Sequence, residues 1–178
     1  MQLLHSLLIS LVVSLVAGKN WITNNADTWL NPSVYYSQSD YHNGYRQDCS
    51  GYVSMAWQLG TSAVTWTIPN YAHQIDKSQL QSGDVLLNVD EHVLIFDAWV
   101  DGSQTQYYAY EQTPPQTIYH VVQYPYWPGY GEYVPYRLNG MKNDGTFELP
   151  TPFNRTARAA VADASQAGKT SLRGRASN

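Results

Sequence analysis

The sequence predicts an α+β domain in which one helix packs against an antiparallel sheet. Apolar residues recur at helical spacing after Asp48 and Cys49, which predicts one clear helix. After Gly83 the pattern changes to short apolar runs of strand length, separated by turn residues. The chain has 178 residues, enough for one domain with a buried core and too few for two comfortable ones. We therefore expect a single domain in which the helix precedes the strands.

Composition excludes several classes of protein. Only 13% of the residues are charged, against roughly 25% in an ordinary soluble domain. The formal net charge of −4 excludes the broad basic surface with which proteins bind nucleic acid. The single cysteine, Cys49, excludes an intrachain disulfide framework and a zinc site built from several cysteines. His42 and His120 lack partners at metal-ligand spacing, so we predict no metal and no cofactor.

Residues 1–18 have the layout of a secretory signal peptide. An apolar run from Leu7 to Val16 contains no charge and precedes the small residues Ala17 and Gly18, near which we expect cleavage. The run is too short to span a bilayer comfortably, and a buried N-terminal helix is the alternative. We therefore expect a secreted monomer that does not associate with membranes after the signal is removed.

The folded domain is expected to cover residues 19–140, followed by a mostly disordered tail at 141–178. The tail has no Tyr, Trp or Cys, so it cannot bury enough apolar surface to offset the entropy of ordering it. It holds six of the ten basic residues and three of the fourteen acidic ones, which leaves a net charge of about −7 before it. Asn154 begins an N-glycosylation sequon, which is meaningful only in a eukaryotic host.

The helical part of the domain comes first. Residues 20–44 are broken by Asn, Pro, Ser and Gly, and predict a loop with one short helix around residues 26–30. The main helix is predicted to begin at Cys49, with Asp48 as its N-cap, and to continue to Leu59 until Gly60 stops it. Residues 71–80 fit neither a helix nor a strand clearly.

Strands are predicted for the rest of the domain. Residues 85–89 and 92–96 form an antiparallel pair joined by an acidic turn at Asp90 and Glu91. Further strands fit residues 106–112, 117–123 and 133–138. The aromatic segment at 124–131 either stacks on sugar rings or covers the sheet, and we favour a covering role.

Cys49 is a candidate nucleophile because it lies in the first turn of the predicted helix. There the positive end of the helix dipole and the unpaired N–H groups stabilise a thiolate relative to a thiol. The same N–H groups can bind the oxyanion that forms when a thiolate attacks an amide carbonyl. A buried, inert thiol and an intermolecular disulfide are the alternatives.

A nucleophilic thiolate requires a base. The candidates are His42, His73, His92 and His120. We favour His92, because it opens an apolar strand at the edge of a turn, from which its ring can project toward the helix start. A third group must accept a hydrogen bond from the imidazole. Glu111 and Gln112 both fit, and we prefer Glu111 because a carboxylate also stabilises the imidazolium.

Residues 45–53, Tyr-Arg-Gln-Asp-Cys-Ser-Gly-Tyr-Val, resemble the Asp-Cys-Ser-Gly motif of NlpC/p60-type cysteine peptidases. Residues 80–87 and 92–96 look like that family's Gly-Asp strand and His-Val strand, in the family's order. The resemblance spans about residues 45–112 and implies a papain-like α+β fold. It also implies hydrolysis of amide bonds in bacterial cell-wall stem peptides, commonly beside D-glutamate and diaminopimelate.

Carried onto this sequence, the resemblance implies that Cys49 is the nucleophile and His92 the general base. The backbone N–H of Cys49 is then an oxyanion donor. Glu111 takes the third position, where histidine is most usual in the family. Two further departures bear on the shape of the cleft: Leu94 replaces a small residue, and the loop at 97–106 is longer than is typical.

The residues beside the cysteine are candidates for substrate binding. They are Tyr45, Arg46, Asp48 and Ser50. Arg46 is either a partner for a stem-peptide carboxylate or an ordinary surface arginine. Asp48 either positions the substrate or only caps the helix. Tyr45, together with Tyr41, is expected to line the cleft.

We therefore expect a secreted cysteine endopeptidase or amidase that acts on peptidoglycan stem peptides through Cys49, His92 and Glu111. One alternative is acyl transfer by the same Cys-His pair, with an amine or alcohol in place of water. The other is a non-catalytic module that binds glycan or peptide in an aromatic cleft, with Cys49 vestigial. Reactivity of Cys49 that depends on His92 separates the enzymes from the binding module.

Overall fold

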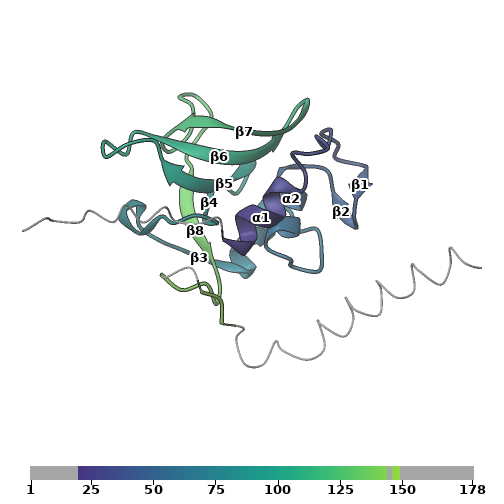
Figure 1. The fold of residues 1–178 in the computed structure, drawn as a ribbon, viewed down its shortest axis with the longest axis horizontal. Helices are drawn as coiled ribbons and strands as arrows, with labels where there is room; N and C mark the ends of the chain where they lie inside the picture. The colour runs from purple at the N-terminus through teal and green to yellow at the C-terminus, as the bar shows by residue number, and fades with distance from the viewer. Residues whose placement is uncertain (1–19, 144–145, 149–178) are drawn as a thin grey trace, which may run out of the picture.

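The computed structural model describes residues 20–143 and 146–148 (Figure 1). It confirms the α+β class, with few helices and a six-stranded antiparallel sheet. The helices are α1 (Trp21–Asp27) and α2 (Cys49–Ala56), with 3-10 turns η1 (Thr65–Asn70) and η2 (Lys77–Gln79). A small hairpin is formed by β1 (Tyr41–His42) and β2 (Tyr45–Arg46). The strands of the large sheet are β3 (Ala72–Gln74), β4 (Val85–Asn88), β5 (His92–Trp99), β6 (Gln106–Thr113), β7 (Gln116–Gln123) and β8 (Val134–Leu138).

The large sheet has the order β3-β8-β4-β5-β6-β7. Its centre is an antiparallel meander from β4 to β7, and β8 returns to pair with β4 on one side and β3 on the other. Asn88 pairs with His92 across the predicted acidic turn, so His92 is the first residue of β5. The strands predicted after Gly83 are all present, with bounds that differ by a few residues at most.

The first helix differs from the prediction. The side-chain oxygen of Asn20 accepts hydrogen bonds from the backbone N–H groups of Ile22 and Thr23, and this cap starts α1 at Trp21 rather than near residue 26. The predicted main helix is confirmed from Cys49, but it ends at Ala56. Gln58 adopts a left-handed backbone with φ 53°, which ends the helix before the predicted stop at Gly60.

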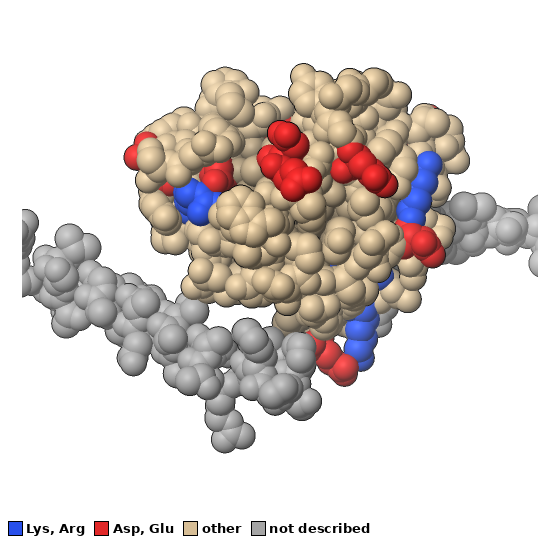
Figure 2. All heavy atoms as spheres, turned by 180° about the vertical axis from the view of Figure 1, so that it is seen from behind, with Lys and Arg blue, Asp and Glu red and all other residues tan. Residues whose placement is uncertain are grey.

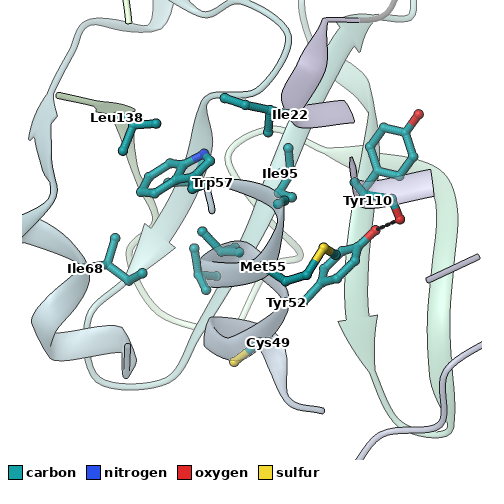
Figure 3. Packing of buried hydrophobic residues seen from close by; sticks show 14 of the residues in the cluster. Ile22, Cys49, Tyr52, Met55, Trp57, Ile68, Ile95, Tyr110 and Leu138 are labelled. Carbon is teal, nitrogen blue, oxygen red and sulfur yellow. Dashed lines mark hydrogen bonds between the residues drawn. The ribbon is translucent and has the colours of Figure 1, made fainter. Parts of the chain in front are cut away.

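Two hydrophobic clusters lie on opposite faces of the sheet, as the alternation of side chains along a strand requires. The first packs α1 and α2 against residues such as Val93, Ile95 and Tyr110, and Figure 3 shows Cys49 at the helix end of this cluster. The second contains Leu94, Phe96, Tyr107, Ala109, Val122 and Tyr133, among others. Tyr124 and Tyr126 pack against it, which is the covering role favoured for the 124–131 segment.

Contacts with the domain continue beyond residue 140. Met141 is only 6% exposed and forms a bridge with Phe147, so residues beyond the predicted boundary at 140 pack on the domain. The predicted signal peptide, the Asn154 sequon and most of the predicted tail lie outside the described residues. Among residues 20–143 and 146–148, no helix has the length and apolar character needed to cross a membrane.

Candidate active site

The start of α2 is held by its own sequence motif. The Oδ1 atom of Asp48 accepts a hydrogen bond of 2.8 Å from the backbone N–H of Gly51, which caps the helix. A Cβ atom on Gly51 would lie 1.9 Å from the carbonyl oxygen of Arg46. Only glycine therefore allows β2 to lie this close to the first turn of α2. This contact fixes the position of Cys49, which is 7% exposed.

The residues predicted to bind substrate are engaged in holding this turn. The guanidinium of Arg46 forms a salt bridge with Asp48 and donates hydrogen bonds to the Ser50 hydroxyl (3.1 Å) and the Ala63 carbonyl (3.0 Å). Asp48 and Ser50 are 6% and 3% exposed. The Tyr45 hydroxyl accepts a hydrogen bond from the backbone N–H of Gly60. The structure thus assigns Tyr45, Arg46, Asp48 and Ser50 to the frame around Cys49, because their polar groups pair with the protein itself.

The predicted base and third residue are brought together. The Nε2 atom of His92 lies 2.7 Å from Oε1 of Glu111, and the Glu111 side chain is 2% exposed. Burial raises the pKa of Glu111, but hydrogen bonds from His120 and His92 outweigh burial and lower that pKa to about 2. Glu111 is therefore a carboxylate at neutral pH. A carboxylate only accepts hydrogen bonds, so Nε2 of His92 carries the proton.

Cys49 is the second acidic partner of His92, because hydrogen bonding with its side chain and its charge both raise the pKa of the His92 ring. Burial lowers the pKa of His92, but the hydrogen bonds with Cys49 and Glu111 outweigh burial and raise that pKa to about 9. The site therefore favours an imidazolium ring between two acidic partners. An imidazolium beside a thiol stabilises the thiolate, which is the reactive form of cysteine.

Gln112, the alternative third residue, has a structural role. Because successive residues on a strand point to opposite faces, Gln112 points away from the face that carries Glu111. It is fully buried, and its Nε2 donates hydrogen bonds to the carbonyls of Tyr35 (3.2 Å) and Gln47 (3.1 Å). Its Oε1 accepts one from Thr117 at 2.7 Å. Gln112 thus holds the segment before α2 against the sheet.

Two further residues contact the Glu111 carboxylate. His120 Nε2 lies 2.6 Å from Oε2, and the Tyr126 hydroxyl donates to Oε1 at 2.6 Å. The sequence suggested His120 as a candidate base, and placed Tyr126 in an aromatic segment that either stacks on sugar rings or covers the sheet. The register of β6 and β7, which pairs Ala109 with His120, places His120 diagonally opposite Glu111. Pairing the strands predicted at residues 106–112 and 117–123 as a hairpin would have placed His120 near Glu111.

Tyrosines other than the predicted ones lie near the thiol. Burial raises the pKa of Tyr36, and the charge of Cys49 adds to that rise. Burial also raises the pKa of Tyr133, followed by the charges of Glu111 and Cys49. Tyr41, which was expected to line the cleft, is 61% exposed. With fifteen tyrosines in the chain, the sequence carries no signal that distinguishes Tyr36 and Tyr133.

A cleft of about 750 Å³ opens beside His92. Four tyrosines contribute to its wall: Tyr126, Tyr130, Tyr133 and Tyr136. Its charged residues, apart from His92, are Asp90, Glu91 and Glu132, and no Lys or Arg lies among its lining residues. Figure 2 shows Asp and Glu side chains in the middle of one face of the molecule, whereas the Lys and Arg side chains lie nearer its margins.

The described residues contain no group of three or more His, Cys, Asp or Glu side chains placed to hold a metal ion. What they contain is a thiol at a helix start, a histidine whose pKa that cysteine raises, and a buried carboxylate 2.7 Å from the histidine. Comparisons with protein-family models, with curated proteins and with solved structures found no match to this chain. The chemistry of the site is therefore argued from its own geometry.

Proposed function

We propose that this protein is a secreted cysteine peptidase of papain-like fold that hydrolyses amide bonds in bacterial peptidoglycan stem peptides. The proposal depends chiefly on one observation: His92 is held at 2.7 Å by the buried Glu111, and the side chain of Cys49 raises the pKa of the same His92 ring. A nucleophile, a base and a group that orients the base are the three parts of a Cys-His hydrolase. The resemblance of residues 45–112 to NlpC/p60-type peptidases supports the fold and the substrate class, and residues 1–18 support secretion.

In the proposed reaction, the Cys49 sulfur attacks the amide carbonyl, and the oxyanion is stabilised by the backbone N–H of Cys49 at the start of α2. His92 then donates a proton to the leaving amine as the C–N bond breaks, which leaves a thioester on Cys49. Water attacks the thioester while His92 accepts its proton, the C–S bond breaks, and the carboxylic acid leaves as the Cys49 thiolate and the protonated His92 are regenerated. Glu111 keeps the proton of His92 on Nε2, so that Nδ1 serves the reaction.

The cleft beside His92 bears on the substrate. Its wall combines tyrosine rings with Asp90, Glu91 and Glu132, so an ammonium group is attracted there by both the rings and the carboxylates. A stem peptide that contains diaminopimelate carries such a free amino group as well as carboxylates. We therefore propose that the amino-bearing part of the stem peptide lies in this cleft.

Digestion of defined soluble muropeptides, read by mass spectrometry, tests the proposal. The wild-type protein should produce two fragments whose masses sum to that of the substrate plus one water, and Cys49→Ala should produce none. A His73→Gln variant is a matched control, because His73 is exposed and bonds to Asn139, not to Glu111. Intact muropeptides after digestion with the folded wild-type protein would contradict the proposal.

The same digestion separates hydrolysis from acyl transfer. When an amine such as glycinamide is added, a hydrolase gives the same water-derived fragments, whereas a transferase gives adducts that contain the amine. If neither reaction occurs but the muropeptide slows alkylation of Cys49, the protein is a binding module and the peptidase proposal is wrong.

A further inference from the structure

His120 lies behind the catalytic pair. It is in β7, where its ring is 30% exposed, and its Nε2 lies 2.6 Å from Oε2 of Glu111 in β6. On the other side of the carboxylate, Oε1 receives His92 at 2.7 Å and the Tyr126 hydroxyl at 2.6 Å. Three side chains thus run in a row from Cys49 toward the protein surface: His92, Glu111 and His120.

We propose that His120 is a positioning residue, which fixes the Glu111 carboxylate so that its Oε1 atom faces His92. The proposal rests on the proposed function, because it concerns the same Cys49 site. His120 does not touch the thiol or a substrate. It acts through Glu111, and its effect is on how strongly the site favours a thiolate on Cys49.

The two carboxylate oxygens of Glu111 differ in the number of hydrogen-bond donors that they contact. Oε1 has two donors, His92 and Tyr126, whereas His120 is the donor on Oε2 among the described side chains. Glu111 is 2% exposed, so an Oε2 atom without a donor would be buried and unpaired, which is costly for a charged oxygen. Rotation of the carboxylate toward the remaining donors would relieve this cost, and that rotation would misalign Oε1 with His92.

The ionisable groups around Glu111 come from several elements. They are His92 from β5, His120 from β7, Tyr126 and Tyr133 from the segment that covers the sheet, and Tyr107 from β6. The largest contributions to the pKa of Glu111, after burial, come from His120, His92 and Tyr126. Tyr126 and His92 both donate to Oε1, so the loss of either one leaves a donor on that oxygen. Loss of His120 leaves Oε2 without a donor from the described side chains, and the carboxylate is then freest to rotate.

The test is the rate of Cys49 alkylation by iodoacetamide, measured between pH 4 and 10 in the full-length protein. Cys49 is the single cysteine, so the rate reports this site alone. The alkylation rate of Cys49 is expected to rise with pH. For His120→Phe we expect this rise to move to higher pH by about one unit, so that at a given pH below the midpoint the rate is about tenfold lower than in the wild type. His120→Gln, whose amide N–H can still reach Oε2, should restore most of the wild-type profile. His73→Gln should leave the profile unchanged.

A structural role alone would lower the melting temperature without moving the pH profile. If the Phe variant is unfolded, His120→Ala repeats the measurement, because it removes the donor and adds no volume at a part-exposed site. A wild-type profile in the folded Phe or Ala variant would overturn the proposal. If the wild-type protein does not cleave muropeptides, but the His120 variants still show the shifted alkylation profile, only the proposed function is contradicted.

Discussion

At the scale of single residues, the candidate site is governed by one buried carboxylate. Glu111 accepts three hydrogen bonds of 2.6–2.7 Å, from His92, His120 and Tyr126, and these keep it ionised although it is 2% exposed. An ionised Glu111 holds His92 as an imidazolium, since hydrogen bonds with Cys49 and Glu111 raise the pKa of His92 to about 9. We therefore expect the reactivity of Cys49 to depend on Glu111, which acts through His92.

Glu111→Gln should change the pH dependence of catalysis. His92 must be protonated to donate to the leaving amine, so kcat/KM of the wild type should fall as pH rises through about 9. Removal of the negative charge lowers the pKa of His92, so this alkaline limb should move down by about 1–2 units. The measurement is kcat/KM against pH on a defined muropeptide. An alkaline limb that stays in place in the variant would contradict the role of Glu111.

The pKa values of Glu111 and His92 also predict how the free energy of unfolding changes with pH. The pKa of Glu111 is lowered to about 2, so its contribution is present above pH 4.5 and is lost as pH falls toward 2. The pKa of His92 is raised, so its contribution is present below pH 6.5 and is lost as pH rises through about 9. Denaturant midpoints measured from pH 2 to 10 should fall at both ends. In Glu111→Gln the fall below pH 4.5 should be smaller.

At the scale of elements, the positions of α2 and β5 made Cys49, His92 and Glu111 predictable. Cys49 lies at a helix start, His92 at a strand start after a turn, and Glu111 two residues before the end of β6. His120 and Tyr126 were not predicted, because their contacts depend on the register of β6 with β7 and on the path of the 124–131 segment. The start of α1 at Trp21 was missed because its cap, Asn20, lies in a stretch rich in turn residues.

The contact of β2 with α2 makes Gly51 a sensitive position. A methyl group at Gly51 would overlap the Arg46 carbonyl, since its Cβ would lie 1.9 Å from that oxygen. Gly51→Ala should lower the free energy of unfolding by about 1–3 kcal/mol and slow Cys49 alkylation, because the helix start must shift. Gly102→Ala is the matched control, since nothing lies within 4 Å of its added Cβ. Equal stabilities of the two variants in urea would show that the helix start is not tightly held.

A buried ion pair joins β8 to the residue that precedes β4. Arg137 and Asp84 are 2% and 1% exposed in their side chains, and two N–O contacts of 2.8 and 2.7 Å join them. Arg137→Met should lower the free energy of unfolding by about 3–5 kcal/mol, because it leaves the Asp84 charge buried. Lys142→Met, at the exposed pair with Glu148, should cost no more than about 1 kcal/mol. Urea unfolding of both variants checks the difference, and a small effect at Arg137 would contradict it.

At the scale of the whole molecule, charge is unevenly distributed. The chain carries a net charge of −4, yet the residues before 141 carry about −7. Part of this negative charge lines the cleft beside His92, at Asp90, Glu91 and Glu132. The Arg46 charge, which was expected to bind a substrate carboxylate, is neutralised by Asp48. Substrate charge at this cleft is therefore expected to be positive.

Charged thiol reagents test whether the negative charge of the cleft acts on molecules that approach Cys49. A methanethiosulfonate that carries trimethylammonium should modify Cys49 faster than one that carries sulfonate. In the double variant Glu91→Gln, Glu132→Gln, the ratio of the two rates should fall about tenfold, since each charge at about 10 Å contributes roughly 0.4 kcal/mol in water. Asp76→Asn with Asp101→Asn, two exposed acids outside the cleft lining, should leave the ratio near the wild-type value. An unchanged ratio in the cleft variant would contradict a cationic subsite.

We expect Cys49, activated by His92, to cleave peptidoglycan amides. The most direct test is the initial rate at which purified sacculi release new amino termini. The wild type should release them steadily, whereas Cys49→Ser and His92→Ala should reduce the rate to background while circular dichroism shows an unchanged fold. Release by a folded Cys49→Ser variant at the wild-type rate, or no release by the wild type, would contradict the claim.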